Sequence, residues 1–342
     1  MRYAHSPGHG HSRKRLLKIG AIAAACYIVV LAGLWFIFGN LEKGEDVPEP
    51  VGSLDGRFDY DSIQLERDGK TYTYRNRALI NLLFIGIDWA DVETDTTTLR
   101  YSGQSDFMLL MTIDKKNKSI HTLHIDRDTI TPVRVYGPFG DFAGTKDMQI
   151  CLSYAYGEDQ KANCENGVWA ASNLLKGVPI DYYIVVDMEG ISVLNDALGG
   201  VTVTLEDDFS HSDPEMTKGS VITLKGKQAE LYVRGRMGIG EGTNSSRMVR
   251  QRTFMKQAMQ MLVDGMKKDL DFIGKLYDEM DEHAETNIDR GWIINKAYES
   301  ADYEREEMLT IAGTHEIGED GFMEFHPDED ALLDMLTTYY FE

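Results

Sequence analysis

The sequence predicts an α/β protein in which a central sheet lies between layers of helices. The prediction rests on unbroken apolar segments at residues 82–87, 107–113 and 183–186, which do not alternate between apolar and polar side chains. Strands of this kind are usually covered on both faces. Helical patterns are interleaved with them along the chain, which is the α/β arrangement. The helical segments are residues 168–175, 188–198 and 246–266.

Turn signals delimit the shorter elements. Residues 58–74 predict a hairpin, because Asp68-Gly69 favours a tight turn between two strands. Further strands are expected at 120–125 and at 201–205, the second one after Gly199-Gly200 has ended a helix. With about 260 residues beyond the N-terminal region and no second linker, these elements suffice for one large core.

The C-terminal part is expected to be helical and acidic. This expectation covers the residues after Lys267, which are rich in Asp and Glu. The chain should finish in a helix that starts near Pro327, since acidic residues in a first turn stabilise a helix N-terminus.

The charge of the chain excludes nucleic acid as a partner. The formal net charge is -21, and the first 18 residues hold five basic residues and no acidic one. The remainder therefore carries 30 Lys and Arg against 56 Asp and Glu residues, a net charge of -26. A nucleic-acid-binding protein needs a broad basic surface, so isolated arginines in this acidic body suit a small anion better.

Residues 19–38 form an uncharged apolar segment long enough to cross a bilayer. Basic residues precede it and acidic residues follow it, so the positive-inside rule places the N-terminus in the cytoplasm and the rest of the chain outside. No small-residue cleavage site clearly follows, which favours a retained membrane anchor over a cleaved signal. Residues 39–56 have the composition of a linker.

The cysteines and the N-terminal histidines give weaker signals. Cys151 and Cys164 lie beyond the anchor, and the sequence is compatible with one disulfide or with two unpaired thiols. His5, His9 and His11 lie in a Gly-, Ser- and Pro-containing tail, where metal binding is a minor possibility.

Five arginines are concentrated in one short stretch and predict an anion-binding site. Arg234 and Arg236 share a face if residues 232–236 form a strand, and Arg247 and Arg250 share one face of a helix, with Arg252 close by in sequence. Guanidinium groups match phosphate oxygens with paired donors and remain charged at physiological pH. A solvated basic face with a few carboxylate partners is the alternative that the spacing also allows.

Carboxylates and a further arginine stand at predicted strand ends. Asp88 ends the first buried strand, Asp106 opens the next, and Arg127 follows the third. Strand ends are where α/β proteins commonly bind ligands. Two carboxylates can hold Mg²⁺ together with phosphate oxygens and water, so the combination suits a pyrophosphate with magnesium. Either aspartate alone is equally compatible with a cap or a turn.

These motifs together resemble the LytR-CpsA-Psr (LCP) family of membrane-anchored cell-envelope transferases in Gram-positive bacteria. The resemblance extends from about residue 79 to 257. The matching segments, in order, are residues 83–88, 105–106, 126–129, 153–157, 177–183, 194–201, 224–229, 232–236 and 247–251.

The resemblance implies a three-layer α-β-α fold with a mixed central sheet, preceded by one transmembrane helix. It also implies transfer of a glycopolymer, such as a teichoic acid or capsular polysaccharide, from an undecaprenyl-pyrophosphate carrier to peptidoglycan, with formation of a phosphodiester. In the family an apolar tunnel in the core holds the lipid tail. The expected parts are a cytoplasmic tail (1–18), a membrane helix (19–38), an extracellular linker with a hairpin (39–76) and the catalytic domain with a helical C-terminal extension (77–342).

The family motifs assign roles to individual residues. Asp88 and Asp106 match the magnesium-associated aspartates, and either Asp88 or the metal-bound assembly is expected to ease deprotonation of the attacking hydroxyl. Asp88, Arg127, Arg234 and Arg236 form the expected catalytic set. The residues expected to bind pyrophosphate are Arg127, Arg234, Arg236, Arg247, Arg250, Gln251, Gln104 and Gln149.

Three positions depart from the commoner family pattern. Gln104 stands where many members have Arg, Gln149 where many have Lys, and Asp126 where Pro usually precedes the motif arginine. Two cations are therefore missing, although Lys146 is close in sequence. A non-catalytic lipid-pyrophosphate-binding regulator of the envelope is the alternative function that these changes leave open.

Overall fold

The structure is a computed structural model that describes residues 63–75, 78–89, 103–136, 142–155, 159–236 and 238–342. The expected cytoplasmic tail, membrane helix and linker lie outside these residues. Among the described residues, no helix combines the length and the apolar character needed to cross a membrane.

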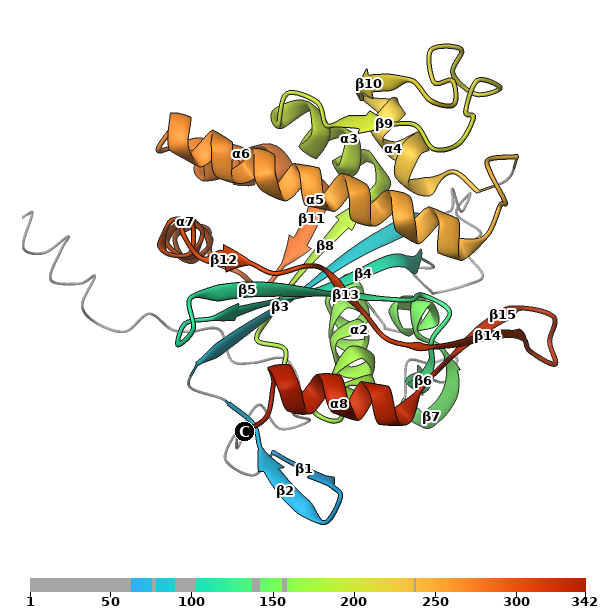
Figure 1. Cartoon of the computed structure of the whole chain (residues 1–342), viewed down its shortest axis with the longest axis vertical. Coiled ribbons are helices and arrows are strands. Elements are labelled where there is room, and N and C mark those ends of the chain that lie inside the picture. The colour runs from blue at the N-terminus through green and yellow to red at the C-terminus, as the bar shows by residue number, and fades with distance from the viewer. Residues whose placement is uncertain (1–62, 76–77, 90–102, 137–141, 156–158, 237) are drawn as a thin grey trace, which may run out of the picture. The chain divides into compact units, whose positions relative to one another are not determined.

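A mixed sheet forms the centre of the described domain (Figure 1). The strand order is β11-β8-β3-β4-β5-β12, and β13 also pairs with β5. β3 is antiparallel to β4 and parallel to β8, whereas β12 and β13 run parallel to β5. The strands are β3 (Leu79–Trp89), β4 (Gly103–Asp114), β5 (Ser119–Ile125), β8 (Tyr182–Asp187), β11 (Ala284–Thr286), β12 (Glu304–Arg305) and β13 (Leu309–Thr310).

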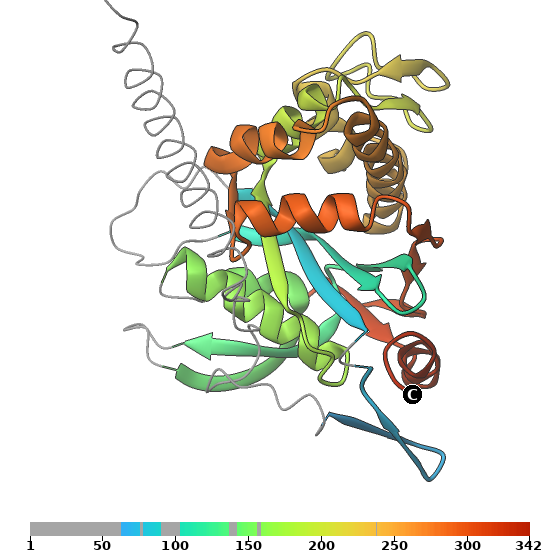
Figure 2. The ribbon, with the colours of Figure 1, turned by 90° about the vertical axis from the view of Figure 1, so that its left-hand side faces the viewer.

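Helices cover both faces of this sheet, as the unbroken apolar strands predict (Figures 1 and 2). On one face, α2 (Gln160–Leu174) and α8 (Glu329–Tyr339) bury Val168 and Leu336 against Leu83 and Met108 of the sheet. On the other, Trp292 of α7 (Arg290–Glu299) packs against Tyr182 of β8, with ring centroids 4.1 Å apart and an angle of 43° between the ring planes. The three-layer arrangement is therefore confirmed for the described residues.

Four more helices complete the second layer and carry much of the site. They are α3 (Met188–Ala197), α4 (Lys227–Arg234), α5 (Asn244–Lys268) and α6 (Phe272–Met280). α3, α4 and α5 share an apolar core that includes Val201, Tyr232 and Phe254. Gly200, which follows α3, has φ +92°, and a Cβ there would lie 2.8 Å from the Leu224 carbonyl oxygen. Only glycine therefore lets the chain turn from α3 into β9 (Thr202–Thr204), which pairs with β10 (Val221–Thr223).

The predicted Asp68-Gly69 hairpin is confirmed. It joins β1 (Gln64–Arg67) to β2 (Lys70–Thr73), and Asp68 and Gly69 have φ values of 51° and 71°. Positive φ at both central residues is the turn geometry that matches the twist of a hairpin. Cys151 and Cys164 are both buried and unpaired.

The expectation of an all-helical C-terminal part is wrong. α6, α7 and α8 are present, but β11, β12, β13 and the β14–β15 hairpin lie among them. β14 (Gly313–Ile317) and β15 (Met323–Pro327) flank a turn in which Gly321 has φ 83°. The expectation rested on the acidic composition of this part of the chain, and it therefore overlooked the turn signal at Gly321. A further hairpin is formed by β6 (Ile130–Tyr136) and β7 (Phe142–Gln149).

Candidate active site

An open cavity of about 1310 Å³ lies at the ends of β3 and β4, beneath α4 and the start of α5. Most of the residues expected from the sequence meet there. Those that line the cavity are Asp88, Gln104, Asp106, Arg127, Arg234, Arg236 and Arg247.

A β-bulge directs Asp106 into the cavity. Gly86 pairs with Phe107, but the next residue, Ile87, pairs with Ser105, so Asp106 has no opposing residue on β3. A bulge of this kind interrupts the alternation of side chains and re-aims the extra residue. As a result, Asp106 shares the cavity with Asp88 although the two stand on different strands.

Asp106 holds two arginines by opposite oxygens. Its Oδ1 accepts from Arg127 Nη1, and its Oδ2 accepts from Arg247 Nη1 at 2.9 Å. Arg247 is only 1% exposed, and a second nitrogen, Nη2, donates to Asn244 Oδ1 at 2.7 Å. Burial lowers the pKa of Arg247, an effect that the charge of Asp106 opposes. Asp106 therefore holds the guanidinium groups of Arg127 and Arg247 close together in the wall of the cavity.

Arg127 is also held from the opposite side. Its Nη2 donates to Gln104 Oε1 at 2.7 Å and to Cys151 Sγ at 3.2 Å. Burial raises the pKa of Cys151 to about 11, so the thiol is neutral at physiological pH. The positive charge of Arg127 is consequently balanced by Asp106 and by Asp128, whose Oδ1 lies 3.4 Å from Arg127 Nε, and not by the sulfur.

The prediction of a strand at residues 232–236 is wrong, because Arg234 ends helix α4. One nitrogen of Arg234, Nη2, donates to both carboxylate oxygens of Asp88 at 2.7 Å. Its Nη1 donates to Glu230 Oε1, one helical turn earlier, at 3.2 Å. The spacing of four residues between Glu230 and Arg234 was a helical signal that the strand interpretation missed.

Arg236 is an exposed arginine of the cavity wall that differs from Arg234 in its lack of a carboxylate partner within the described part of the chain. It follows the Gly235 cap of α4, and among the described residues it forms no ion pair. An exposed guanidinium without a carboxylate partner is available to an incoming anion.

Arg250 and Gln251 lie outside the open cavity and stabilise the end of α4. Arg250 donates to the carbonyl oxygens of Tyr232 and Gly235 and, at 2.8 Å, to Asp207 Oδ2. Gln251 Nε2 donates to the Val233 carbonyl oxygen at 3.3 Å. The two residues therefore fix the helix end that carries Arg234.

Gln149 also lies away from the cavity. It ends β7, and its amide Nε2 donates to the Met323 carbonyl oxygen of β15 at 3.2 Å. Lys146, on the same strand, is exposed and does not line the cavity either.

Asp126 takes part in a buried network that the sequence did not reveal. Its Oδ1 accepts from Asn244 Nδ2 at 2.8 Å, and its Oδ2 lies 2.8 Å from His315 Nε2 of β14. Asn244 in turn accepts from Arg247. Burial and the neighbouring charge of Asp126 raise the pKa of Asp128. The C-terminal hairpin is thus linked by hydrogen bonds to an arginine of the cavity.

A second cavity, of about 100 Å³, adjoins the first and shares Asp106, Arg234 and Arg247 with it. Gln251 lines it too, but most of its wall is apolar. The apolar lining residues are Phe84, Ile85, Phe107, Val186, Met188, Ile191, Leu194, Val233, Phe254 and Met255. Charge and apolar surface therefore meet at Asp106, Arg234 and Arg247.

The donor set fits a hard divalent cation. Asp88 and Asp106 offer carboxylate oxygens to the same cavity, and each such oxygen can accept more than one partner. Mg²⁺ needs only one or two protein carboxylates when phosphate and water complete its shell. Asp88 and Asp106 can therefore coordinate Mg²⁺ while their carboxylates keep their contacts with the arginines.

Comparisons with known proteins agree with this geometry. A model of the LytR_cpsA_psr family matches residues 57–339. The chain is 27% identical over 345 residues to the polyisoprenyl-teichoic acid–peptidoglycan teichoic acid transferase TagV of Bacillus subtilis (strain 168), covering 96% of this chain and 75% of that protein. The crystal structure of B. subtilis TagV matches with a TM-score of 0.57 and 26% identity, over 76% of this chain and 95% of that chain.

A structure of TagT bound to LIIa-WTA matches with a TM-score of 0.59, over 84% of this chain and 96% of that chain. Its sequence identity is 17%, so this likeness shows the fold alone.

Proposed function

Because the chain belongs to the LytR-CpsA-Psr family, we propose that it transfers a teichoic acid or related glycopolymer from an undecaprenyl-pyrophosphate carrier to peptidoglycan. One observation carries this proposal: Asp88, Asp106 and four arginines share one open cavity, and three of these residues also border an apolar cavity. A pyrophosphate lipid has the same division into a highly anionic part and an apolar chain. The name of the relative TagV, a teichoic acid transferase, supports the same substrate class.

The proposed reaction forms one phosphoester bond and breaks the phosphoanhydride bond of the pyrophosphate. A sugar hydroxyl of peptidoglycan attacks the phosphorus that bears the glycopolymer. The bond from this phosphorus to the bridging oxygen breaks, and undecaprenyl phosphate leaves with that oxygen. The products are a phosphodiester and the monophosphate carrier, and the hydroxyl proton passes to a carboxylate. Asp88, which lines the cavity and is oriented by Arg234, suits this role.

The arginines would bind and neutralise the pyrophosphate. Arg236 is exposed and has no carboxylate partner among the described residues, so it can bind the pyrophosphate without first breaking an ion pair. Arg127 and Arg247 present preorganised donors around Asp106. Fixed cations stabilise the charge that develops on transferring phosphoryl groups without reorganisation during the reaction.

Asp88 and Asp106 would hold Mg²⁺, as the family resemblance implies. When bound, the metal would share the negative charge of the pyrophosphate with the arginines. Arg250 would act indirectly, through the end of α4, whereas Gln251 also lines the apolar cavity and can contact the lipid chain there. Gln149 has no such role, because its amide is engaged at β15.

We also propose a cell-membrane location, with residues 19–38 as a single anchor, the N-terminus in the cytoplasm and the catalytic domain outside. The charge distribution around that segment supports this orientation. The test is to introduce single cysteines before and after residues 19–38 and to label intact cells with a thiol reagent that does not cross the membrane. Only the cysteines after the segment should react.

The alternative is a regulator that binds lipid pyrophosphate without turnover. Gln104 favours it, since a neutral amide contacts Arg127 where many family members have a further cation. Incubation with a lipid-linked saccharide, Mg²⁺ and a peptidoglycan oligomer separates the two functions. A phosphodiester-linked product supports the transferase, and tight binding without product supports the regulator.

A further inference from the structure

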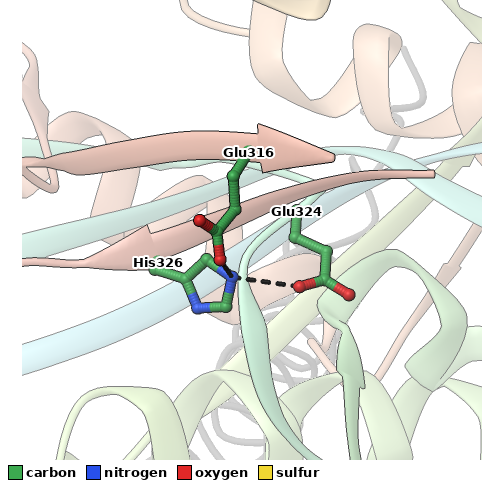
Figure 3. Close-up of side chains that lie close together, drawn as sticks. All are labelled: Glu316, Glu324 and His326. Atoms are coloured by element: carbon green, nitrogen blue, oxygen red, sulfur yellow. Dashed lines mark hydrogen bonds and ion pairs between the residues drawn. The ribbon is translucent and has the colours of Figure 1, made fainter. Parts of the chain in front are cut away.

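The β14–β15 hairpin carries a histidine and two glutamates that converge on one point outside the active-site cavity (Figure 3). His326 Nε2 lies 3.1 Å from Glu316 Oε1 and 3.0 Å from Glu324 Oε2. The three ligand atoms all lie within 4.8 Å of one another. We propose that these residues bind a divalent transition-metal ion, for which zinc is the best match.

The separations of these atoms fit tetrahedral zinc. With Zn–N and Zn–O bonds of about 2.0–2.2 Å, neighbouring ligand atoms of a tetrahedron are roughly 3.3–3.6 Å apart. The two distances from His326 Nε2, at 3.0 and 3.1 Å, are close to the lower end of this range. Three protein ligands leave the fourth position to water. An imidazole among the ligands favours zinc or a similar ion over Mg²⁺ and Ca²⁺, which prefer oxygen.

The strand register places two like charges directly opposite each other. Glu316 of β14 pairs with Glu324 of β15, and like charges in this position destabilise a strand pair. His326 lies two residues beyond Glu324 and so points to the same face of the hairpin. A bound dication neutralises both glutamates at once, whereas a protonated histidine supplies a single positive charge.

The hairpin that carries the three ligands is anchored to the rest of the described domain. Phe325, between the two β15 ligands, is 5% exposed, and its backbone N–H donates to the Asp128 carbonyl oxygen at 2.8 Å. His315, beside Glu316, points to the other face and contacts Asp126. A Cβ at Gly318 would lie 2.3 Å from Glu324 Oε1. The glycine therefore leaves room for the carboxylate in this position.

The same hairpin offers a route for an ion to enter. The side chain of Glu316 is 65% exposed and that of His326 is 39% exposed. Glu324 is more enclosed, at 26%. The proposed site is therefore open on the Glu316 side, and metal exchange requires no unfolding of the hairpin.

Calorimetric titration of the full chain in detergent with ZnCl₂ tests the proposal. The variants are His326→Gln and Glu324→Gln, and the matched control is Glu319→Gln, which removes the same charge from an exposed position in the turn. Loss of a direct ligand should weaken one zinc site by at least about tenfold, the scale seen even for outer-shell changes. Zinc should also raise the melting temperature of the native chain and the control more than that of either ligand variant.

Co²⁺ provides an independent reading of the ligands. The native chain should give a visible absorption band that is lost in His326→Gln and kept in Glu319→Gln. These differences exclude contributions from the N-terminal histidines and from the active-site aspartates, because every variant retains them. If His326→Gln does not fold, Glu316→Gln, at the most exposed ligand, takes its place.

Equal zinc affinity in native chain and ligand variants would show that the three residues form an ion-pair cluster without metal. An equal loss in the Glu319→Gln control would show that only the net charge of the hairpin matters. Either result overturns the proposal, and neither bears on the transferase activity.

Discussion

A single nitrogen of Arg234 donates to both carboxylate oxygens of Asp88 at 2.7 Å. Arg234 stands at the end of α4 and Asp88 near the end of β3, so this contact joins the helix layer to the sheet at the mouth of the cavity. The Arg234 side chain is 43% exposed. It can therefore face a ligand as well as Asp88.

Replacing Arg234 by alanine should abolish transfer without unfolding the protein. Loss of one preorganised donor to a developing charge typically costs about 10²- to 10³-fold in rate, while an exposed ion pair contributes roughly 0–1 kcal/mol to stability. Arg234→Lys should not restore activity, because lysine lacks the planar pair of donors. Transfer rates and thermal melts of the two variants check this. Near-native transfer by the alanine variant would remove Arg234 from the site.

Asp88→Asn and Asp106→Asn should both reduce transfer but differ in stability. Asp106 lies between two largely buried arginines, and loss of its charge leaves them facing each other. Removal of one partner from a buried ion pair costs roughly 3–5 kcal/mol. Asp88 pairs at an exposed position, so its substitution should cost roughly 0–1 kcal/mol.

Denaturant unfolding and Mg²⁺ titration in the presence of a pyrophosphate lipid measure the two effects. The sequence alone treated these aspartates as an equivalent pair, whereas the structure distinguishes them by burial. Similar stability of the two variants would contradict the proposed role of Asp106. Unchanged Mg²⁺ affinity in both would exclude them as metal ligands.

Local patterns were sufficient to predict much of the fold. Apolar segments without alternation identified β3, β4 and β8, and Asp68-Gly69 identified a hairpin, because each signal depends on neighbouring residues only. Side-chain direction at the site depended on tertiary structure. Arg250 shares a helix with Arg247, yet it turns to the carbonyl groups of α4. Three residues along a helix leave side chains about 60° apart, which is enough to separate a ligand-facing arginine from one that supports a helix end.

The bulge at Asp106 was equally inaccessible to sequence reasoning. It arises from the pairing of β4 with β3, and a one-residue change of register is not visible in either strand alone. Gln149 illustrates the same limit, since its position in β7 says nothing about the β15 carbonyl group that it contacts.

The protein should lose stability in mild acid because of His121. This residue is 2% exposed, and burial lowers its pKa to about 4. The unfolded chain takes up a proton below a pH of about 6.5 and the native state does not, so stability falls as the pH drops from about 6.5 toward 4. At pH 5 the loss from His121 should be about 2 kcal/mol. Burial lowers the pKa of His124 to about 3, which adds to the loss over the same range.

Urea unfolding at pH 7.5 and pH 5.0 measures this loss. His121→Phe keeps an aromatic ring beside Tyr339 and Tyr340 but cannot titrate, so its stability should depend less on pH than that of the native chain. His211→Phe is the control, because His211 is exposed. The same pH dependence in native chain and His121→Phe would assign the acid sensitivity to other groups.

Restoring the commoner family cation at position 104, but not at 149, should tighten binding of a lipid pyrophosphate. Gln104 lines the cavity and contacts Arg127, so Gln104→Arg adds a charge beside the anion. One charged hydrogen bond contributes roughly 1.5–3 kcal/mol, which corresponds to a gain of about tenfold to hundredfold in affinity. Without ligand, the added charge repels Arg127 and should lower the melting temperature. Turnover need not rise, since tighter binding of the ground state does not lower the chemical barrier.

Gln149→Lys is the matched comparison, because it adds the same charge at a position that does not line the cavity. It should leave affinity for an undecaprenyl-pyrophosphate analogue nearly unchanged at fixed Mg²⁺ and ionic strength. Gln104→Glu, which reverses the added charge, should weaken binding. If the two cationic variants tighten binding equally, the gain reflects the overall charge of the domain and not the contact with Arg127. If Gln104→Arg gives no gain, the pyrophosphate does not reach position 104, and its binding site must lie nearer to Arg236 and Arg234.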